Sequence, residues 1–465
     1  MILTHGYFLE DDEREKAIMK PYPPLGILYL SAYMEVKQIE HEVFDTTFSS
    51  REKFNNFLLS NQPSILAIYI NLMTKINVVK TIEFVRSQPR LQHTKIILGG
   101  PDVRYNKEKL LHSGADFLVI GEGEETFFEL TTALHTNQPY KGIAGISFKL
   151  EDGTIIINPE RSLRKNLDEL PIPNRKKIDL DLYLQTWKTH HGFSSVTVST
   201  MRGCPYSCHW CSRGVYGKSY RRRSPQSVVD EINYIKQAYN PDNIWFVDDV
   251  FTVSHKWLEE FAFLIEQQQI KVNYECITRA DRLNEEVIQL LKQSGCFRVW
   301  IGAESGSQKI IDLMDRRVDV KVVQQMIQAA QQAGIQAGTF IMLGYPTETE
   351  KDIKQTLQHL KNANPEWFTI TITYPIRGTE LFEEVEAISN AHEINWADNT
   401  DRDIDFKRTY TKKYYQYAIQ WIVQEMAFYQ RKRKKLTTIS AMKVKAKSIK
   451  ARIGMLLEKR KPSFA

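Results

Sequence analysis

Cysteine is scarce in this sequence, and long apolar runs are absent. Only 5 of the 465 residues are Cys, and three of these lie close together at Cys204, Cys208 and Cys211, which excludes the disulfide framework of a small secreted protein. No run approaches the roughly 20 apolar positions that a membrane-spanning helix needs. Residues 1–6 also lack the basic and then apolar layout of a signal peptide. We therefore expect a reducing, cytoplasmic location.

Most of the chain carries no excess of positive charge. The excess is concentrated in residues 405–465. The net charge is +6, yet residues 405–465 contain 17 Lys or Arg against 3 Asp or Glu, a local charge of +14 that leaves −8 for the rest. A basic run at 431–435 precedes apolar residues that alternate with lysines up to residue 461. Such a basic amphipathic helix can lie on an anionic membrane surface, remain solvated or bind nucleic acid. Because no RNA-binding fold accompanies it, we expect no nucleic-acid partner. A peripheral contact with the inner face of a membrane remains a hypothesis.

Residues 1–140 alternate short apolar runs with helical runs, as a doubly wound α/β domain does. A nearly continuous apolar run at 64–70 indicates a parallel strand that is buried on both faces. Two glycine turns, Gly99-Gly100-Pro101 and Gly121-Glu122-Gly123, each follow a strand-like run. Since ligands of such sheets bind at the carboxyl ends of the strands, both turns are candidate binding segments. The other expected elements of this domain are strands at 2–4, 42–45, 95–98 and 116–120, and a helix at 25–34.

Three further parts follow this first domain. Residues 141–193 predict a small hairpin around Glu151-Asp152-Gly153 and a proline-punctuated linker. Residues 194–385 return to an alternation of strands and helices, and residues 386–465 predict a helical extension. The expected strands of the third part lie at 196–200, 243–247, 272–276, 298–301, 338–343 and 367–373, and its expected helices at 227–239, 255–268, 284–294, 320–333 and 348–362.

The three clustered cysteines have the spacing C-x3-C-x2-C, directly after a strand-like run. Three thiolates on one tight loop can hold three irons of a cubane iron–sulfur cluster, which leaves the fourth iron open for another ligand. A zinc site or three structural cysteines are the alternatives. Zinc takes four ligands, most often in separated pairs, and His209 inside the loop is the only local candidate for a fourth. Cys276 and Cys296, the other two, are expected to be buried and inert.

This loop resembles that of the radical S-adenosylmethionine (SAM) superfamily. The resemblance implies a partial (β/α)6 barrel and a [4Fe–4S] cluster held by Cys204, Cys208 and Cys211. It also implies that the amino and carboxylate groups of SAM chelate the open iron, and that SAM is cleaved reductively to a 5′-deoxyadenosyl radical. An external electron donor such as flavodoxin or ferredoxin is then a required partner.

Polar residues at the ends of the expected barrel strands are the candidates for SAM binding, because barrel sites lie at the carboxyl ends of strands. Arg279 could meet the SAM carboxylate with its planar fork. By resemblance, Glu304 and Ser305 reach the ribose and methionine parts of SAM, and the backbone of Gly344 and Pro346 meets the adenine. Capping of a helix N-terminus is the alternative role for Glu304.

The N-terminal domain resembles the cobalamin-binding domain found ahead of many radical SAM barrels. The resemblance is carried by Pro23-Pro24-Leu25-Gly26 and the two glycine turns. It implies that Gly99, Gly100, Pro101, Gly121, Glu122 and Gly123 approach the corrin and its nucleotide tail. The D-x-H-x-x-G segment that supplies a histidine to cobalt is missing. Either the cobalt has no histidine ligand, or cobalamin is not bound.

Up to about residue 385 the chain resembles the branch of cobalamin-binding radical SAM proteins that contains the anaerobic magnesium-protoporphyrin monomethyl ester cyclase. The resemblance implies a methyltransferase that acts on an unactivated carbon of a small or lipophilic substrate. An oxygen-independent oxidative cyclase of a tetrapyrrole is a second hypothesis. A non-catalytic cofactor-binding sensor is a third, from another class.

Overall fold

The computed structural model describes residues 1–433 and 439–461. These residues form two compact units. The first unit contains residues 1–205, 212–245 and 395–401, and the second contains residues 206–211, 246–394 and 402–465.

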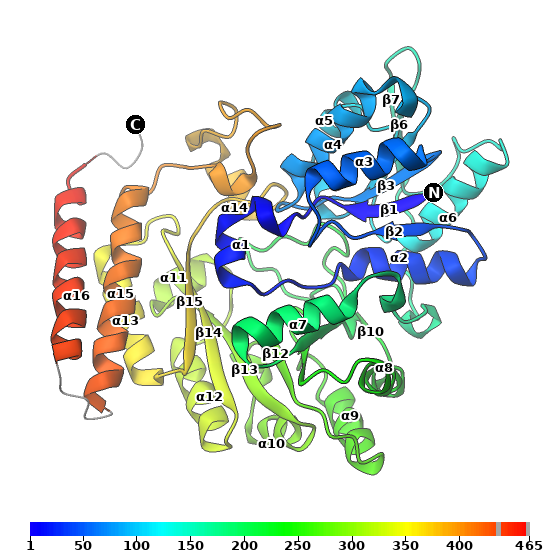
Figure 1. Ribbon diagram of the computed structural model, residues 1–465. Coiled ribbons are helices and arrows are strands. Elements are labelled where there is room, and N and C mark those ends of the chain that lie inside the picture. Colours follow the sequence, from blue (N-terminus) through cyan, green and yellow to red (C-terminus); the bar gives the residue numbers. More distant parts are fainter. Residues whose placement is uncertain (434–438, 462–465) are drawn as a thin grey trace. The chain divides into compact units, whose positions relative to one another are not determined.

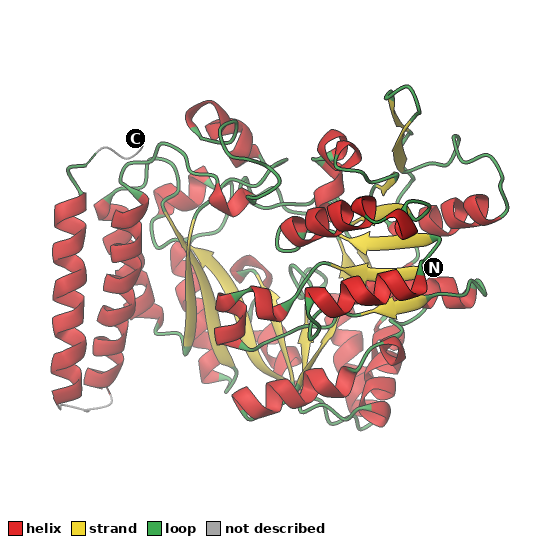
Figure 2. Cartoon of the chain, turned by 45° about the horizontal axis from the view of Figure 1, so that its top comes forward, coloured by secondary structure: helices red, strands yellow, loops and turns green. Residues whose placement is uncertain are grey.

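A mostly parallel sheet is the centre of the first unit, and Figure 2 shows its strands in yellow. The strand order is β2-β1-β3-β4-β5-β6-β7, parallel from β2 to β5 and antiparallel over the last two strands. This confirms the predicted α/β domain. The strands are β1 Ile2–His5, β2 Glu42–Phe44, β3 Ile65–Tyr69, β4 Lys95–Gly99, β5 Phe117–Val119, β6 Ile146–Lys149 and β7 Ile155–Ile157.

Both faces of this sheet are buried, as the apolar run at 64–70 predicts. Leu66 and Ile68 of β3 belong to one hydrophobic core cluster, whereas Ile65 and Ala67 belong to another. Successive side chains of a strand point to opposite faces, so each face has a core of its own. The helices of this unit are α1 Glu13–Ile18, α2 Leu25–Val36, α3 Arg51–Asn61, α4 Lys75–Ser87, α5 Lys107–His112, α6 Gly123–His135, α7 Leu180–His191 and α8 Pro225–Ala238.

The region expected as hairpin and linker differs from the prediction in two ways. The hairpin β6–β7 does form, but β6 pairs with β5 and extends the first sheet. Helix α7 was not predicted, although its ends are marked in the sequence. The side chain of Asp179 accepts a hydrogen bond from the backbone of Leu182, and Gly192 ends the helix with φ = +79°.

The second sheet has the strand order β15-β14-β13-β12-β11-β8. The pairs from β12 to β15 are parallel, as expected for a βα barrel segment, with a register shift at Tyr274/Glu275 in β12 and another at Gly302/Glu304 in β13. All six predicted strands are present, with ends shifted by a few residues. They are β8 Ser195–Val198, β11 Asn243–Phe246, β12 Tyr274–Thr278, β13 Cys296–Glu304, β14 Gln336–Leu343 and β15 Trp367–Ile372. A short antiparallel pair, β9 Met201–Arg202 and β10 Arg221–Arg222, flanks the cysteine loop in the sequence.

Local capping signals set where the helices of the second unit begin. Ser254 accepts a hydrogen bond from the backbone of Trp257 at the start of α9, and Thr349 and Asp352 form a capping box at the start of α13. The helices are α9 His255–Gln267, α10 Glu285–Gln293, α11 Gln308–Leu313, α12 Val320–Gln332, α13 Glu350–Ala363, α14 Glu380–Val385, α15 Lys412–Arg433 and α16 Ile439–Glu458.

The predicted helical extension is the pair α15 and α16, which lie side by side (Figure 1). Of the basic run at 431–435, residues 431–433 end α15, and 434–435 lie outside the described residues. Over the described parts of the chain, no helix combines the length and the apolar character that crossing a bilayer requires.

Candidate active site

The cysteine loop leaves β9 at Gly203 and reaches the second unit at Tyr206. Gly203 has φ = +85°, and a Cβ atom there would lie 2.2 Å from the Ser219 hydroxyl, so only glycine fits this turn. In the second unit the loop is held by backbone hydrogen bonds from His209 N to Met314 O (3.1 Å) and from Leu381 N to His209 O (3.0 Å). The loop is therefore fixed by its backbone.

None of the three cysteines of the loop is part of a disulfide. Cys208 is buried, and Cys204 and Cys211 are partly buried. Within residues 1–433 and 439–461, no three His, Cys, Asp or Glu side chains gather closely enough to hold a metal ion. The three thiols lie on one tight loop.

Two buried guanidinium groups lie beside the sulfur of Cys208. Arg279 Nη1 is 3.7 Å from Cys208 Sγ, and Arg316 Nη1 is 3.6 Å from it. The Arg279 guanidinium also stacks on the ring of Tyr206, 3.9 Å from its centroid. Two buried cations beside one sulfur suit a negatively charged group, such as an iron–sulfur cluster held by cysteines.

The fork of Arg279 is occupied by groups of the protein itself. Nε and Nη2 pair with the two carboxylate oxygens of Asp281 at 2.9 and 3.2 Å, and Nη2 also donates to Arg316 O at 2.7 Å. Only Nη1 is directed elsewhere, toward Cys208. Arg279, the predicted clamp on the SAM carboxylate, thus contacts Asp281, Arg316 O and Cys208.

Glu304 ends β13 in a buried, left-handed conformation, with φ = +62° and 4% of its surface exposed. Its Oε1 lies 3.4 Å from Arg316 Nη2, and it makes no other ion pair or hydrogen bond through its side chain within the described residues. Burial raises the pKa of Glu304, although Arg316 and Arg279 oppose the rise. A carboxylate with acceptor oxygens to spare can bind the hydroxyl groups of a ribose.

Gly302 makes room for this arrangement. A Cβ atom at Gly302 would lie 2.3 Å from Arg316 Nη2 and 2.7 Å from Glu304 Oε1. Arg316 Nη2 also donates to Gly302 O at 3.1 Å. The glycine, the arginine and the carboxylate therefore form one packed unit at the carboxyl end of β13, the end at which barrel sites lie.

In the first unit, the glycine turn after β4 leaves open space next to its backbone. A Cβ atom at Gly99 would have no neighbour closer than Val119 Cβ at 4.0 Å. At Gly100, with φ = +120°, a Cβ atom would lie 2.3 Å from Ile70 O. Pro101 then begins the 3-10 turn Pro101–Arg104. The turn needs glycine for its shape at Gly100 and offers close access at Gly99.

Two family models match the chain, the radical SAM superfamily over residues 198–360 and the B12 binding domain over residues 18–131. An uncharacterized methyltransferase of Pyrococcus horikoshii is 30% identical over 393 residues, which are 82% of this chain and 82% of that protein. The anaerobic magnesium-protoporphyrin IX monomethyl ester cyclase of Rubrivivax gelatinosus is 22% identical over 78% of this chain and 66% of that protein.

Among solved structures, the cobalamin-dependent S-adenosylmethionine radical enzyme OxsB with aqua-cobalamin bound has a similar fold. The match has a TM-score of 0.76 and 16% identity, and it covers 98% of this chain and 72% of that one.

The chain belongs to the cobalamin-binding radical SAM enzymes. The predicted family and fold class are confirmed. Because the family consists of enzymes, the alternative of a non-catalytic sensor is rejected. The cofactors of this radical SAM enzyme are a [4Fe–4S] cluster, SAM and cobalamin. The residues described above fit them: thiols beside buried cations suit the cluster, a buried carboxylate with spare acceptor oxygens suits SAM, and the open glycine turn suits a corrin.

Other predicted residues of the radical SAM enzyme are engaged within the protein. The Ser305 hydroxyl contacts Thr356 Oγ1 at 3.2 Å and accepts a hydrogen bond from Ser307 N at 3.1 Å. Gly344, with φ = +82°, donates its N–H to Glu348 at 2.5 Å and accepts from Arg408 Nε at 3.2 Å. These contacts favour a role for Ser305 and Gly344 in shaping their turns. Pro346 is partly buried in the same turn.

Glu122, which is predicted to approach the corrin, is directed toward arginines. It accepts hydrogen bonds from Arg202 Nη1 (2.8 Å), Arg221 Nη1 (2.7 Å) and Arg164 N (2.8 Å). Glu124 pairs with the same Arg202 at 2.5 Å. Burial alone would raise the pKa of Glu124, but Arg202 lowers it below its ordinary value. A Cβ atom at the flanking Gly121, with φ = +85°, would lie 4.0 Å from its nearest neighbour, Arg104 Nη2, and one at Gly123 would lie 3.8 Å from Val119 Cγ1.

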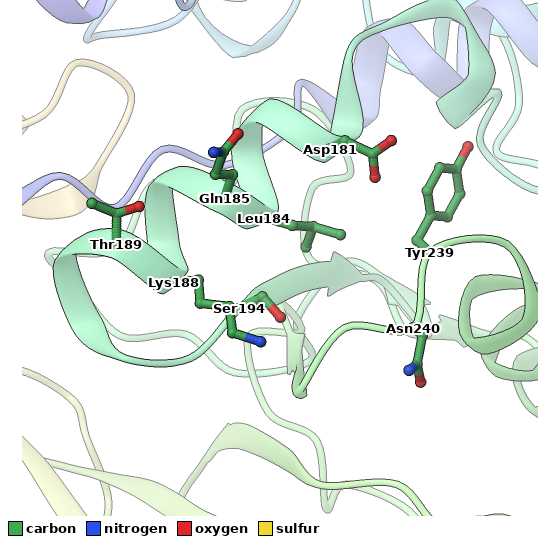
Figure 3. A pocket seen from close by; sticks show the side chains of 8 residues that line it. All are labelled: Asp181, Leu184, Gln185, Lys188, Thr189, Ser194, Tyr239 and Asn240. Atoms are coloured by element: carbon green, nitrogen blue, oxygen red, sulfur yellow. The ribbon is translucent and has the colours of Figure 1, made fainter.

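A cavity of about 440 Å³ lies elsewhere in the first unit (Figure 3). It is lined by α7 residues such as Leu184 and Lys188, by Ser194 just before β8, and by Tyr239 and Asn240 just after α8. It therefore lies at the amino end of β8, opposite to the end at which barrel sites are found. We do not assign the reaction to this cavity.

Arg316 is the main residue of the site that the sequence analysis missed. Its signal in the sequence is weak, because Arg316 stands beside Arg317, which is exposed and pairs with Asp315 on the surface. Only the fold shows that Arg316 is directed inward, to Cys208 and Glu304.

Proposed function

We propose that this radical SAM enzyme transfers a methyl group from SAM to an unactivated carbon of a small or lipophilic substrate. The observation that carries the proposal is the joint match of one chain to the radical SAM and B12-binding models, together with a relative named as a methyltransferase that is 30% identical over most of both chains. A B12-binding domain supplies a methyl carrier that a radical SAM barrel alone lacks.

When bound, the cluster and SAM supply a 5′-deoxyadenosyl radical, and cobalamin supplies the methyl group. The hydrogen abstracted from the substrate leaves in 5′-deoxyadenosine. The transferred methyl comes from a second SAM molecule, which leaves as S-adenosylhomocysteine. The electrons come from an external donor, a flavodoxin or ferredoxin in our proposal.

In this scheme the residues of the chain bind the cofactors and orient them. Cys204, Cys208 and Cys211 hold the cluster, and Arg279 and Arg316 hold the Sγ atom of Cys208 from two sides. Glu304 accepts hydrogen bonds from the ribose of SAM. The Gly99-Gly100-Pro101 and Gly121-Glu122-Gly123 turns approach the corrin, with Glu122 acting through its arginine partners.

One face of β13–β15 supports a substrate with apolar parts. Trp300 and Phe340 stack on this face with ring centroids 5.0 Å apart, and Trp300 Nε1 donates to Glu275 at 3.0 Å. Gly338, the register partner of both Trp300 and Trp367, leaves room for the Trp300 ring. Trp367 is 51% exposed. Aromatic surfaces of this kind bind flat or apolar molecules.

Oxidative cyclisation is the second candidate function, because a magnesium-protoporphyrin cyclase is among the relatives. The two reactions differ in their products. Methyl transfer releases S-adenosylhomocysteine and adds a methylene to the mass of the substrate, whereas oxidative cyclisation releases 5′-deoxyadenosine and methionine from SAM and no S-adenosylhomocysteine.

The test uses the full chain, reconstituted anaerobically with iron, sulfide and hydroxocobalamin and then mixed with SAM and a strong reductant. Mass spectrometry should detect both 5′-deoxyadenosine and S-adenosylhomocysteine, and Cys208→Ala should form no 5′-deoxyadenosine. Formation of 5′-deoxyadenosine alone would favour the cyclase. If neither product forms while iron and cobalamin are both retained, the proposed function is wrong.

A further inference from the structure

Helix α16 has two apolar faces, and only one of them is used inside the protein. Ala441, Val444, Ser448, Ala451 and Met455 are buried with a spacing of three or four residues, as in a helix that packs on one neighbour. The neighbour is α15, which contributes Glu425, hydrogen-bonded by the Ser448 hydroxyl at 2.5 Å. This face accounts for the attachment of α16.

The other face of α16 carries large apolar side chains in contact with solvent. Met442 is 73% exposed, Ile449 53%, Ile453 51%, Leu456 54% and Leu457 69%. Their spacing of mostly three, four or seven residues places them along one side of the helix. Elsewhere in the described residues, large apolar side chains that are more than half exposed occur singly, at Val36, Ile157, Phe263 and Trp367. A continuous exposed apolar stripe of this kind marks an interaction surface.

Exposed lysines line one edge of this stripe. Lys443 and Lys450 each directly follow a residue of the stripe, and Lys447 lies between them on the same side. All three are exposed, and none forms an ion pair within the described residues.

The cations along the other edge of the stripe are engaged in ion pairs. Lys445 pairs with Glu425 at 2.6 Å, Lys459 pairs with Glu350 at 2.8 Å, and Arg452 also pairs with Glu350. Within the described residues, the lysines of α16 that lie outside ion pairs are thus those of the lysine edge next to the stripe.

We propose that this outer face of α16 docks on an anionic lipid bilayer, with the helix lying in the plane of the membrane surface. The apolar stripe enters the interfacial region, and the lysine edge pairs with anionic headgroups. A second copy of the chain fits less well, because packing stripe against stripe would set the lysine edge of one copy against a cationic edge of the other. This is the lysine edge when the helices run antiparallel and the edge of Lys445, Arg452 and Lys459 when they run parallel. Nucleic acid would use the lysines and leave the apolar stripe exposed to water.

This docking goes beyond methyl transfer and does not depend on it. It would bring the enzyme to the surface in which lipophilic molecules are dissolved. A failure of membrane binding would leave the products of SAM cleavage unaffected, so the two proposals fail separately.

The experiment is co-sedimentation of the full chain with two sets of vesicles, phosphatidylcholine alone and phosphatidylcholine mixed with phosphatidylglycerol. We expect binding to the mixed vesicles only, weakened by salt. The double variant Ile453→Glu/Leu457→Glu should weaken binding at least about tenfold. Replacing Lys443, Lys447 and Lys450 by Gln should weaken it about a hundredfold, because each lysine near an anionic surface contributes about 1 kcal/mol.

Matched variants separate docking from general effects of charge or stability. Phe263→Glu adds a carboxylate at a similarly exposed position on α9, and it should bind as the wild type does. The Lys→Arg triple variant should also bind normally, because it keeps the charge. Circular dichroism of each variant checks that the fold is kept.

Three outcomes would overturn the proposal. The first is no binding to anionic vesicles. The second is binding that the Ile453→Glu/Leu457→Glu variant leaves unchanged, since charge alone would then be responsible. The third is a concentration-dependent dimer in sedimentation velocity that this same variant abolishes, since a second copy would then be the occupant of the face.

Discussion

Arg316 joins the two halves of the candidate site in the second unit. Its guanidinium reaches Cys208 Sγ at 3.6 Å, Gly302 O at 3.1 Å and Glu304 Oε1 at 3.4 Å. One buried cation thus faces both a proposed cluster ligand and a proposed SAM ligand. Because removing one partner of a buried ion pair leaves an uncompensated charge, the three groups depend on one another.

The cysteines offer a test in which the control variants come from the same chain. Cys204→Ala, Cys208→Ala or Cys211→Ala should each abolish the iron–sulfur absorbance and most of the bound iron, because a cubane needs all three thiolates. Cys276→Ala and Cys296→Ala should keep the iron and lose at most about 2 kcal/mol of stability, since both side chains are buried. Iron analysis and the visible spectrum after anaerobic reconstitution are the measurements. Loss of iron in the control variants would contradict the assignment of the ligands.

Glu348 predicts a dependence of stability on pH. Burial raises the pKa of this carboxyl from 4.5 to about 8 in the folded protein. Between these values the unfolded chain is ionised while the folded protein keeps its proton, so the free energy of unfolding falls as pH rises. The full loss is roughly 3–5 kcal/mol.

The Glu348→Gln variant isolates this effect. An amide oxygen can still accept the hydrogen bond from Gly344 N, but the group no longer titrates. Urea unfolding at several values from about pH 5 to about pH 9 should therefore show a flatter profile than the wild type. Glu286→Gln, at an exposed position, should keep the wild-type profile. If the free energy of unfolding of Glu348→Gln falls with pH as steeply as that of the wild type, this carboxyl is not the source of the pH dependence.

At the scale of elements, a buried charge cluster ties the β5–α6 turn to the strands that flank the cysteine loop. Glu122 and Glu124 come from the turn and the first residues of α6. Arg202 comes from β9, directly before Gly203 and Cys204, and Arg221 comes from β10. All of these groups lie in the first unit. The turn assigned to cobalamin and the root of the cluster loop therefore share one ion-pair network.

Glu124→Gln tests this connection. Removing the carboxylate leaves Arg202 partly unpaired, with both side chains at most 10% exposed, and should cost about 3–5 kcal/mol of stability. We also expect less iron per chain, because the root of the loop loses an anchor. Glu160→Gln is the matched control. It removes a carboxylate that is 54% exposed and pairs with Arg104, so it should cost no more than about 1 kcal/mol. Equal losses in the two variants would show that burial of the pair has no special role.

At the scale of the whole molecule, the enzyme combines a B12-binding domain with a radical SAM domain, and a ligand of either one adds to the stability of the folded state. Free hydroxocobalamin at a hundred times its dissociation constant should add about 2.7 kcal/mol to the free energy of unfolding.

Gly99→Ala should remove this gain while leaving the cofactor-free protein folded. The added methyl enters space that is open in the protein but lies where we place the corrin. Gly142→Ala, which also meets nothing within 4 Å, is the control and should keep the gain. Thermal unfolding with and without hydroxocobalamin measures both. If hydroxocobalamin stabilises Gly99→Ala as much as it stabilises the wild type, the corrin binds at another place.

The local features of this protein are determined by its sequence alone. The strands of both sheets, most of the helices and the cysteine spacing follow from apolar periodicity, caps and short motifs, which act between residues close in the chain. The same is true of the glycine turns after β4 and β5. These features were enough to predict the fold class, the family and the cofactors.

Only the tertiary structure decided which polar groups meet, because such pairs join distant parts of the chain. Glu122 and Arg202 are 80 positions apart, and Cys208 and Arg316 are 108 apart. Likewise, the sequence shows that α16 is apolar and basic, but the packing against α15 decides which apolar face is buried. The fold thus leaves Met442, Ile449, Ile453, Leu456 and Leu457 outside because burial on α15 can satisfy only one side of a helix.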